Sequence, residues 1–194
     1  RCLLYSVDFA EIETCQSNSD WDRGARILID AARRLVAAGA DFIVICTNTM
    51  HKVAPQIQAA VDIPILHIAE ATADELGRHA ISRVALLGTR YTMTQDFYKE
   101  KIAARGIEVL IPDPPDIELI NHVIYHELCL GKIAADSKAE LLRIIDELNR
   151  RGAQGVILGC TEIGLLVGPS DTSVPLFDTT VIHAVRTAQL AMND

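Results

Sequence analysis

The sequence lacks the features that mark several large classes of protein. No apolar stretch approaches the about 18 residues that a membrane-spanning helix requires. A basic excess is also missing, because 18 lysines and arginines stand against 26 acidic residues and leave a net charge of −8. Nucleic-acid binding needs a basic face. We therefore expect neither a membrane nor a nucleic acid as a partner.

Paired cysteines are missing as well. The chain has five cysteines, an odd number, and no CxxC pair: Cys2, Cys15, Cys46, Cys129 and Cys160. This pattern disfavours both a disulfide framework and a zinc ribbon, and it favours the reducing cytoplasm. We expect Cys2, Cys46 and Cys129 to be small buried apolar residues and Cys15 to be a loop thiol.

What the sequence does contain is an alternation of β-type and helical segments, without linkers or low-complexity stretches. Predicted strands cover residues 2–9, 41–46, 63–68, 83–88, 107–112, 155–159 and 174–178. Predicted helices cover residues 19–39, 50–61, 70–80, 94–106, 117–131, 137–152 and 179–191. Such alternation is typical of an α/β fold with parallel sheets covered by helices on both faces. Ligands of these sheets bind beyond the carboxyl ends of the strands.

Two of the strand segments form an internal repeat. GADFIVICTNT starts at Gly39 and GAQGVILGCTE at Gly152. The ungapped alignment places Thr47 on Cys160, and the residue before each of them also aligns, Cys46 on Gly159. A repeated βα unit predicts two related halves that face one cleft. Thr47 should then face Cys160, and Cys46 should turn into the core, because successive strand residues point to opposite sides.

The repeat also predicts the domain organisation. We expect two pseudo-symmetric α/β lobes with parallel sheets and with the active site in the cleft between them. Residues 1–76 and 175–194 should form the first lobe, because the last helix repeats the helix after the IPIL segment at 63–66, and residues 77–174 should form the second.

Three short motifs carry a resemblance that covers essentially the whole chain. They are TNTMH at 47–51, GCTE at 159–162 and LLGTRYTM at 86–93. The chain resembles the aspartate/glutamate racemase family, which racemises amino acids without a cofactor. Thr47 stands where that family usually has its first cysteine. The resemblance also implies a missing N-terminal strand with a glycine-rich loop, so we expect a preceding βα unit of about 30–40 residues.

The resemblance implies that two bases act on opposite faces of the substrate's α-carbon. Cys160 would serve the L face, and a helix start beside it should lower its pKa toward neutrality. A threonine hydroxyl is too weak an acid to be a resting base, so Thr47 would hydrogen-bond, hold a water or donate a proton. We therefore expect an L-selective enzyme, with L-aspartate or L-glutamate as its substrate.

Other site residues follow from the same resemblance. Asn48, Thr49 and Thr161 would bind the substrate's ammonium and α-carboxylate groups, helped by backbone N–H groups. Glu162 would accept from the ammonium or tune Cys160, and Lys132 would pair with a carboxylate. Thr89 and Thr92 belong to the third motif and complete the list of substrate-binding residues. The resemblance implies no cofactor, no metal and a homodimer.

Two rival functions stay open. A one-cysteine decarboxylase of malonate-type acids would keep Cys160 but would need an apolar pocket instead of acceptors for an ammonium group. A binding protein without catalysis would bind the ligand and exchange no proton. His122 and His126 are four residues apart and could bind zinc, but without a third ligand nearby we expect a solvated or packed helix face.

Overall fold

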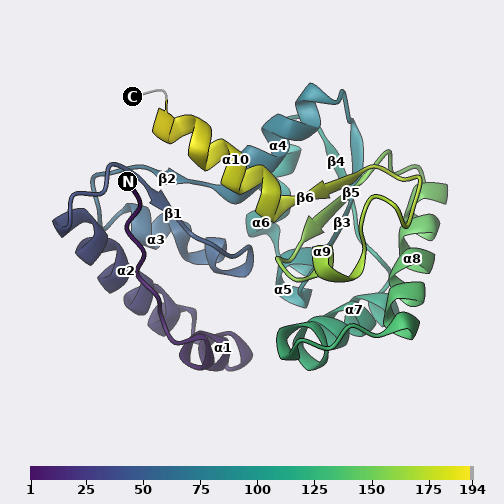
Figure 1. Cartoon of the computed structure of the whole chain (residues 1–194), viewed down its shortest axis with the longest axis horizontal. Helices are drawn as coiled ribbons and strands as arrows, with labels where there is room; N and C mark the ends of the chain where they lie inside the picture. Colours follow the sequence, from purple (N-terminus) through teal and green to yellow (C-terminus); the bar gives the residue numbers. More distant parts are fainter. Residues whose placement is uncertain (193–194) are drawn as a thin grey trace. The chain divides into compact units, whose positions relative to one another are not determined.

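The computed structural model of the chain describes residues 1–192 and divides into two compact units. Unit 1 consists of Arg1–Ile45 and Met50–His67, and unit 2 consists of Cys46–Thr49 and the chain from Ile68 onward. Helices and parallel strands make up both units, which confirms the predicted α/β fold class (Figure 1).

Unit 1 is small and combines helices with one short pair of parallel strands. Its elements are α1 (Phe9–Ser17), α2 (Trp21–Ala37), β1 (Ile43–Val44), the 3-10 helix η1 (Thr49–Val53, whose first residue belongs to unit 2), α3 (Ala54–Gln58) and β2 (Ile65–Leu66). The strand predicted over residues 2–9 is wrong. Asp8 instead accepts a hydrogen bond from the Ala10 backbone N–H at 2.9 Å and caps α1. An aspartate in that position favours a helix start over a continuing strand.

Unit 2 is built on a four-stranded parallel sheet with the order β4-β3-β5-β6. The strands are β3 (Arg83–Gly88), β4 (Glu108–Leu110), β5 (Val156–Gly159) and β6 (Leu176–Asp178). The helices are α4 (Ile68–Arg78), α5 (Arg90–Thr94), α6 (Asp96–Ala103), α7 (Pro114–His126), η2 (Leu128–Leu130), α8 (Ala135–Arg150), α9 (Ile163–Leu166) and α10 (Thr179–Met192). β3 and β5 are the central strands, and the apolar runs predicted for them are buried along almost their whole length.

The units differ from the predicted lobes at residues 46–49, at residues 68–76 and at the C-terminal end. β6 pairs with β5, with Val156 opposite Leu176 and Leu158 opposite Asp178. α10 packs against α4, which also belongs to unit 2. Backbone hydrogen bonds to β5 therefore place the segment after residue 175 with the larger sheet. The sequence prediction rested on the similarity between the last helix and the helix after residues 63–66. That similarity did not reveal the pairing of β6 with β5.

The backbone reproduces the ungapped repeat. α2 ends at Ala37 and α8 at Arg150, each two residues before the repeat's glycine. Gly39 has φ 88° and Gly152 has φ 98°, so both turns use the left-handed conformation that glycine adopts at little cost. β1 and β5 then begin four residues after their glycines. The alignment of Thr47 with Cys160 thus rests on matching helix ends, turns and strand starts.

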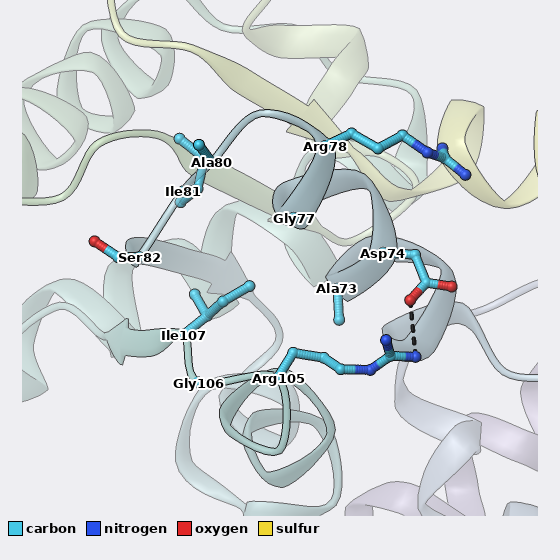
Figure 2. A pocket seen from close by; sticks show the side chains of 10 residues that line it. All are labelled: Ala73, Asp74, Gly77, Arg78, Ala80, Ile81, Ser82, Arg105, Gly106 and Ile107. Atoms are coloured by element: carbon cyan, nitrogen blue, oxygen red, sulfur yellow. Dashed lines mark ion pairs between the residues drawn. The ribbon is translucent and has the colours of Figure 1, made fainter.

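Unit 2 has a hollow of about 740 Å³ between the end of α4 and the turn that leads into β4. Figure 2 shows the side chains that line it. Arg105 in this hollow is ion-paired with Asp74 at 2.8 Å. Its lining residues Ser82 and Ile107 precede β3 and β4, so the hollow lies at the amino ends of the strands. Ligands of parallel sheets bind at the other edge, and we do not assign the site to this hollow.

Within residues 1–192, no helix is both long and apolar enough to span a lipid bilayer.

Candidate functional site

The candidate site begins where β3 and β5 end side by side. Gly88 and Gly159 are the last residues of these strands and lie opposite each other. A Cβ atom at Gly88 would lie 2.8 Å from the Gly159 carbonyl oxygen, and one at Gly159 would lie 2.8 Å from the Leu87 carbonyl oxygen. Only glycine fits this close approach of two backbones. Cys160 follows immediately, at the carboxyl edge of the sheet.

The Cys160 thiol forms a pair with Glu162. Its Sγ donates a hydrogen bond to Glu162 Oε2 at 3.0 Å, and the cysteine is only 8% exposed. Burial raises the pKa of Cys160 well above the ordinary value of a thiol, and the nearby Glu162 carboxylate raises it further. The expected lowering of this pKa by a helix start is therefore wrong. α9 is a four-residue helix, too short to offset burial and a neighbouring negative charge.

Three buried threonine hydroxyls form a cluster beside this edge. Thr49 Oγ1 lies 3.0 Å from Thr89 Oγ1 and 3.4 Å from Thr92 Oγ1, and the last two are 3.1 Å apart. Thr89 also caps α5, because its hydroxyl accepts from the Thr92 backbone N–H. The structure thus brings together the first and third sequence motifs, and the hydroxyls hold Thr49 at the end of β3.

A second set of hydrogen bonds holds the side chain of Asn48. Its Nδ2 donates to Thr179 Oγ1 at 3.0 Å, and Thr179 Oγ1 donates to the Leu158 carbonyl at 2.8 Å. Since the only hydroxyl proton of Thr179 is used on Leu158, Thr179 must accept from Asn48, which fixes the orientation of the amide. Asn48 Oδ1 is then buried without a partner in the described part of the chain. A buried acceptor in this state is costly unless a ligand or water completes it.

The remaining predicted residues differ in their exposure. Thr47 and Thr161 are half-buried next to Asn48 and Cys160 in the chain, whereas Lys132 is exposed in the turn after η2. No hydrogen bond or ion pair in the described structure joins the Lys132 side chain to the residues above. Cys46 is exposed, so its predicted place in the core is wrong. β1 already ends at Val44, and the alternation of a strand does not extend to Cys46.

Sequence reasoning missed two residues near this site. Thr179 stands directly after β6, so the rule that polar residues at strand ends form sites could have identified it. Cys129 lies on η2, which packs against α9, and the Glu162 carboxylate adds to the effect of burial in raising the pKa of this thiol. Cys129 is exposed, contrary to our expectation, and so is Cys2.

Cys15, expected as a loop thiol, is buried within α1. As for metals, no group of three or more His, Cys, Asp or Glu side chains in residues 1–192 is arranged to hold an ion.

Comparison with known proteins agrees with the motifs. Residues 2–187 match the family described as Asp/Glu/Hydantoin racemase. The broad specificity amino-acid racemase RacX of Bacillus subtilis (strain 168) is 27% identical over 168 residues, which cover 87% of this chain and 72% of RacX.

Two solved structures are more similar still. An Asp/Glu racemase candidate from Yersinia pestis has 52% identity and a TM-score of 0.91 over 98% of this chain and 83% of its own. An aspartate racemase homologue from Pyrococcus horikoshii OT3 has 37% identity and a TM-score of 0.84 with the same coverage. The chain belongs to the Asp/Glu/hydantoin racemase family and is an isomerase of the racemase type.

Proposed function

We propose that the chain racemises an acidic amino acid, L-aspartate or L-glutamate, without a cofactor, and that Cys160 takes the α-proton from the L-enantiomer. The observation that carries this proposal is the thiol–carboxylate pair of Cys160 and Glu162 at the carboxyl edge of the sheet. A thiolate is a competent carbon base near neutral pH once it forms. The proposal therefore depends on how the thiol loses its proton.

Substrate binding supplies the missing step. The ammonium group of an amino acid, bound beside Glu162, offsets the negative charge that holds Cys160 protonated. The thiol then passes its proton to Glu162 Oε2, the acceptor that it already contacts at 3.0 Å. The thiolate removes the α-proton and becomes a thiol again, and the substrate becomes a carbanion. Protonation of that carbanion on the opposite face completes racemisation. Glu162 then releases its extra proton to solvent, and the group that protonated the carbanion regains a proton from solvent.

The second acceptor for the ammonium is Asn48 Oδ1, the buried oxygen without a partner. An ammonium donor would satisfy it, while a malonate-type acid, whose ionised carboxylates only accept hydrogen bonds, would leave it unsatisfied. This favours an amino acid over the decarboxylase alternative. Thr49 and Thr161 bind the α-carboxylate, and Lys132 pairs with the side-chain carboxylate. Thr89 and Thr92 keep Thr49 in place through their hydroxyls.

Thr47 serves the opposite face in this proposal. Its hydroxyl, or a water that it holds, donates a proton to the carbanion but does not act as a resting base. Thermodynamics requires equal kcat/KM values for the two directions of racemisation, because the enantiomers have equal free energy. The asymmetry must therefore appear as faster exchange of the α-proton with solvent in the L-enantiomer than in the D-enantiomer.

We further propose that the protein works as a homodimer in the reducing cytoplasm, where exposed thiols such as Cys46 and Cys129 stay reduced. Sedimentation equilibrium of the purified protein tests the dimer directly, and a single monomeric species would overturn that part.

The test of the function is α-proton exchange in heavy water. The protein is incubated with L-aspartate, D-aspartate, L-glutamate or D-glutamate, and proton NMR follows the loss of the α-proton signal. We expect rapid loss from the L-enantiomer of one of the two acids and no loss with Cys160→Ser. Binding of an acidic amino acid without exchange would instead identify a ligand-binding protein.

A further inference from the structure

Helix α7 presents two histidines to solvent, one turn apart. His122 and His126 are both exposed, while Ile120, Val123 and Ile124 of the same helix are buried in the core of unit 2. The centroids of the two imidazole rings are 4.6 Å apart, and the ring planes are inclined by 38°. Residues four apart lie on the same face of a helix, so the spacing is a property of the helix itself.

This separation fits a metal chelate. A metal ion about 2.1 Å from a nitrogen of each ring would lie about 3.2 Å from both ring centroids. Two centroids 4.6 Å apart then subtend an angle of about 90° at the metal. That is the angle between neighbouring ligands in octahedral and tetragonal complexes, which Ni²⁺ and Cu²⁺ prefer, and it is narrower than the tetrahedral angle at zinc.

We propose that His122 and His126 form a binding site for one divalent late transition-metal ion of the Ni²⁺ and Cu²⁺ class. No third His, Cys, Asp or Glu joins them in the described structure, so water fills the remaining positions. His126 is the last residue of α7, where the negative end of the helix dipole favours a cation. The acidic balance of the chain, with a net charge of −8, acts in the same direction.

Another helix of unit 2 offers a matched control. His79, after the end of α4, is also exposed but lies 3.2 Å from a carboxylate oxygen of Glu75. Its only ring neighbour in the described structure is Phe177, so it has no second imidazole to share an ion. The variant His79→Asn therefore removes one exposed histidine and leaves the pair on α7 unchanged.

The experiment is a calorimetric titration of the chelator-treated protein with Ni²⁺, which does not oxidise thiols as Cu²⁺ does. We expect one Ni²⁺ per chain and a rise in the midpoint of thermal unfolding. His122→Asn or His126→Asn should each weaken binding by about 10²-fold or more, since two linked ligands bind about 10²–10⁴ times more tightly than one. His79→Asn should bind like the native protein, and Mg²⁺ should not bind at the pair.

Equal Ni²⁺ affinity in the native protein and in both single variants would overturn the proposal, as would a native protein that binds no Ni²⁺. Loss in only one variant would show a single-imidazole contact and would also overturn it. Both side chains are exposed, so the variants should fold, which far-ultraviolet circular dichroism verifies. None of these outcomes depends on Cys160 or on racemase activity.

Discussion

Cys160 is held as a thiol by the groups that surround it. Burial removes water from the sulfur, and Glu162 adds a negative charge and a hydrogen-bond acceptor. Both effects disfavour the thiolate on which the proposed function depends. In the proposed function, the substrate's ammonium group therefore activates Cys160. Three predictions follow at the scale of single residues.

The first concerns which cysteine is the base. Cys160→Ser should lower α-proton exchange from the L-enantiomer by about 10²–10⁴-fold, the usual contribution of a positioned acid or base. Cys46→Ser should leave exchange nearly unchanged, because Cys46 corresponds to Gly159 in the repeat and not to Cys160. Exchange in heavy water, followed by NMR, measures both. A dead Cys46→Ser variant would mean that the register of the repeat is wrong.

The second concerns pH. In a background in which Cys2, Cys46 and Cys129 are replaced by serine, Cys160 should react with iodoacetamide only well above the about 8.5 at which an ordinary thiol titrates. Glu162→Gln removes the negative charge that raises this pKa, so the alkylation profile should move to lower pH. Exchange activity should nevertheless fall, because the proton acceptor is lost. An unchanged alkylation profile would mean that the Glu162 carboxylate does not raise the pKa of Cys160.

The third concerns Thr47. Thr47→Cys should increase α-proton exchange from the D-enantiomer by up to about 10²-fold, because a thiol can become a resting base and a hydroxyl cannot. Net racemisation should rise equally in both directions, as the equal free energies of the enantiomers require. Chiral chromatography measures net racemisation, and NMR in heavy water measures the exchange of the α-proton. If the parent already exchanges both enantiomers at comparable rates, another residue serves the D face.

At the scale of elements, the ends of strands and helices hold the site together. Thr179, at the start of α10, connects Asn48 of the first motif to the Leu158 carbonyl in β5. Thr89, before α5, connects Thr49 to the end of β3. Each link is a single hydroxyl that contacts at least two other polar groups. Loss of the Thr179 hydroxyl leaves the Asn48 amide without its acceptor.

Replacement of Thr179 tests this arrangement. Thr179→Val keeps the shape of the side chain but removes the acceptor of Asn48 Nδ2, and a buried amide donor left unpaired costs about 1–3 kcal/mol. We expect a higher KM with a smaller change in kcat, because Asn48, the proposed ammonium acceptor, loses its orientation. Thr179→Ser should restore KM, and Thr180→Val, at the exposed neighbouring position, should leave it unchanged. Steady-state kinetics with the preferred amino acid measures the changes in KM and in kcat separately.

Local signals predicted the elements unevenly. The buried strands β3 and β5 and the glycine turns at Gly39 and Gly152 were readable, because long apolar runs and left-handed turns depend on nearby residues alone. The strand predicted at residues 2–9 was wrong, since strand-like composition does not supply a partner strand. The pKa of Cys160 was also misjudged, because burial and the distance to Glu162 are properties of the folded chain. The threonine cluster was predicted as a set of residues but not as a hydrogen-bonded group.

At the scale of the whole molecule, the two units differ in how they are stabilised. Unit 2 has a four-stranded sheet inside a large apolar core, with fully buried residues such as Leu86 and Ile157. Unit 1 has a two-stranded sheet in which Ile43 pairs with Ile65 and Val44 pairs with Leu66. A two-stranded pair is only marginally stable, so unit 1 depends on its helices. The units should therefore open with different free energies.

Hydrogen exchange followed by mass spectrometry tests this difference and the position of the C-terminal segment together. Peptides from β5 and β6 should exchange slowly and in parallel, because the two strands share backbone hydrogen bonds. Peptides from β1 and β2 should exchange earlier, since their ladder is short and their core is small. α10 should follow β6, because it packs against α4 in the same unit. If residues 176–192 instead exchanged together with residues 43–66, the C-terminal segment would be stabilised by the first part of the chain, as the helix repeat had suggested, and the strand pairing of β6 would not govern its stability.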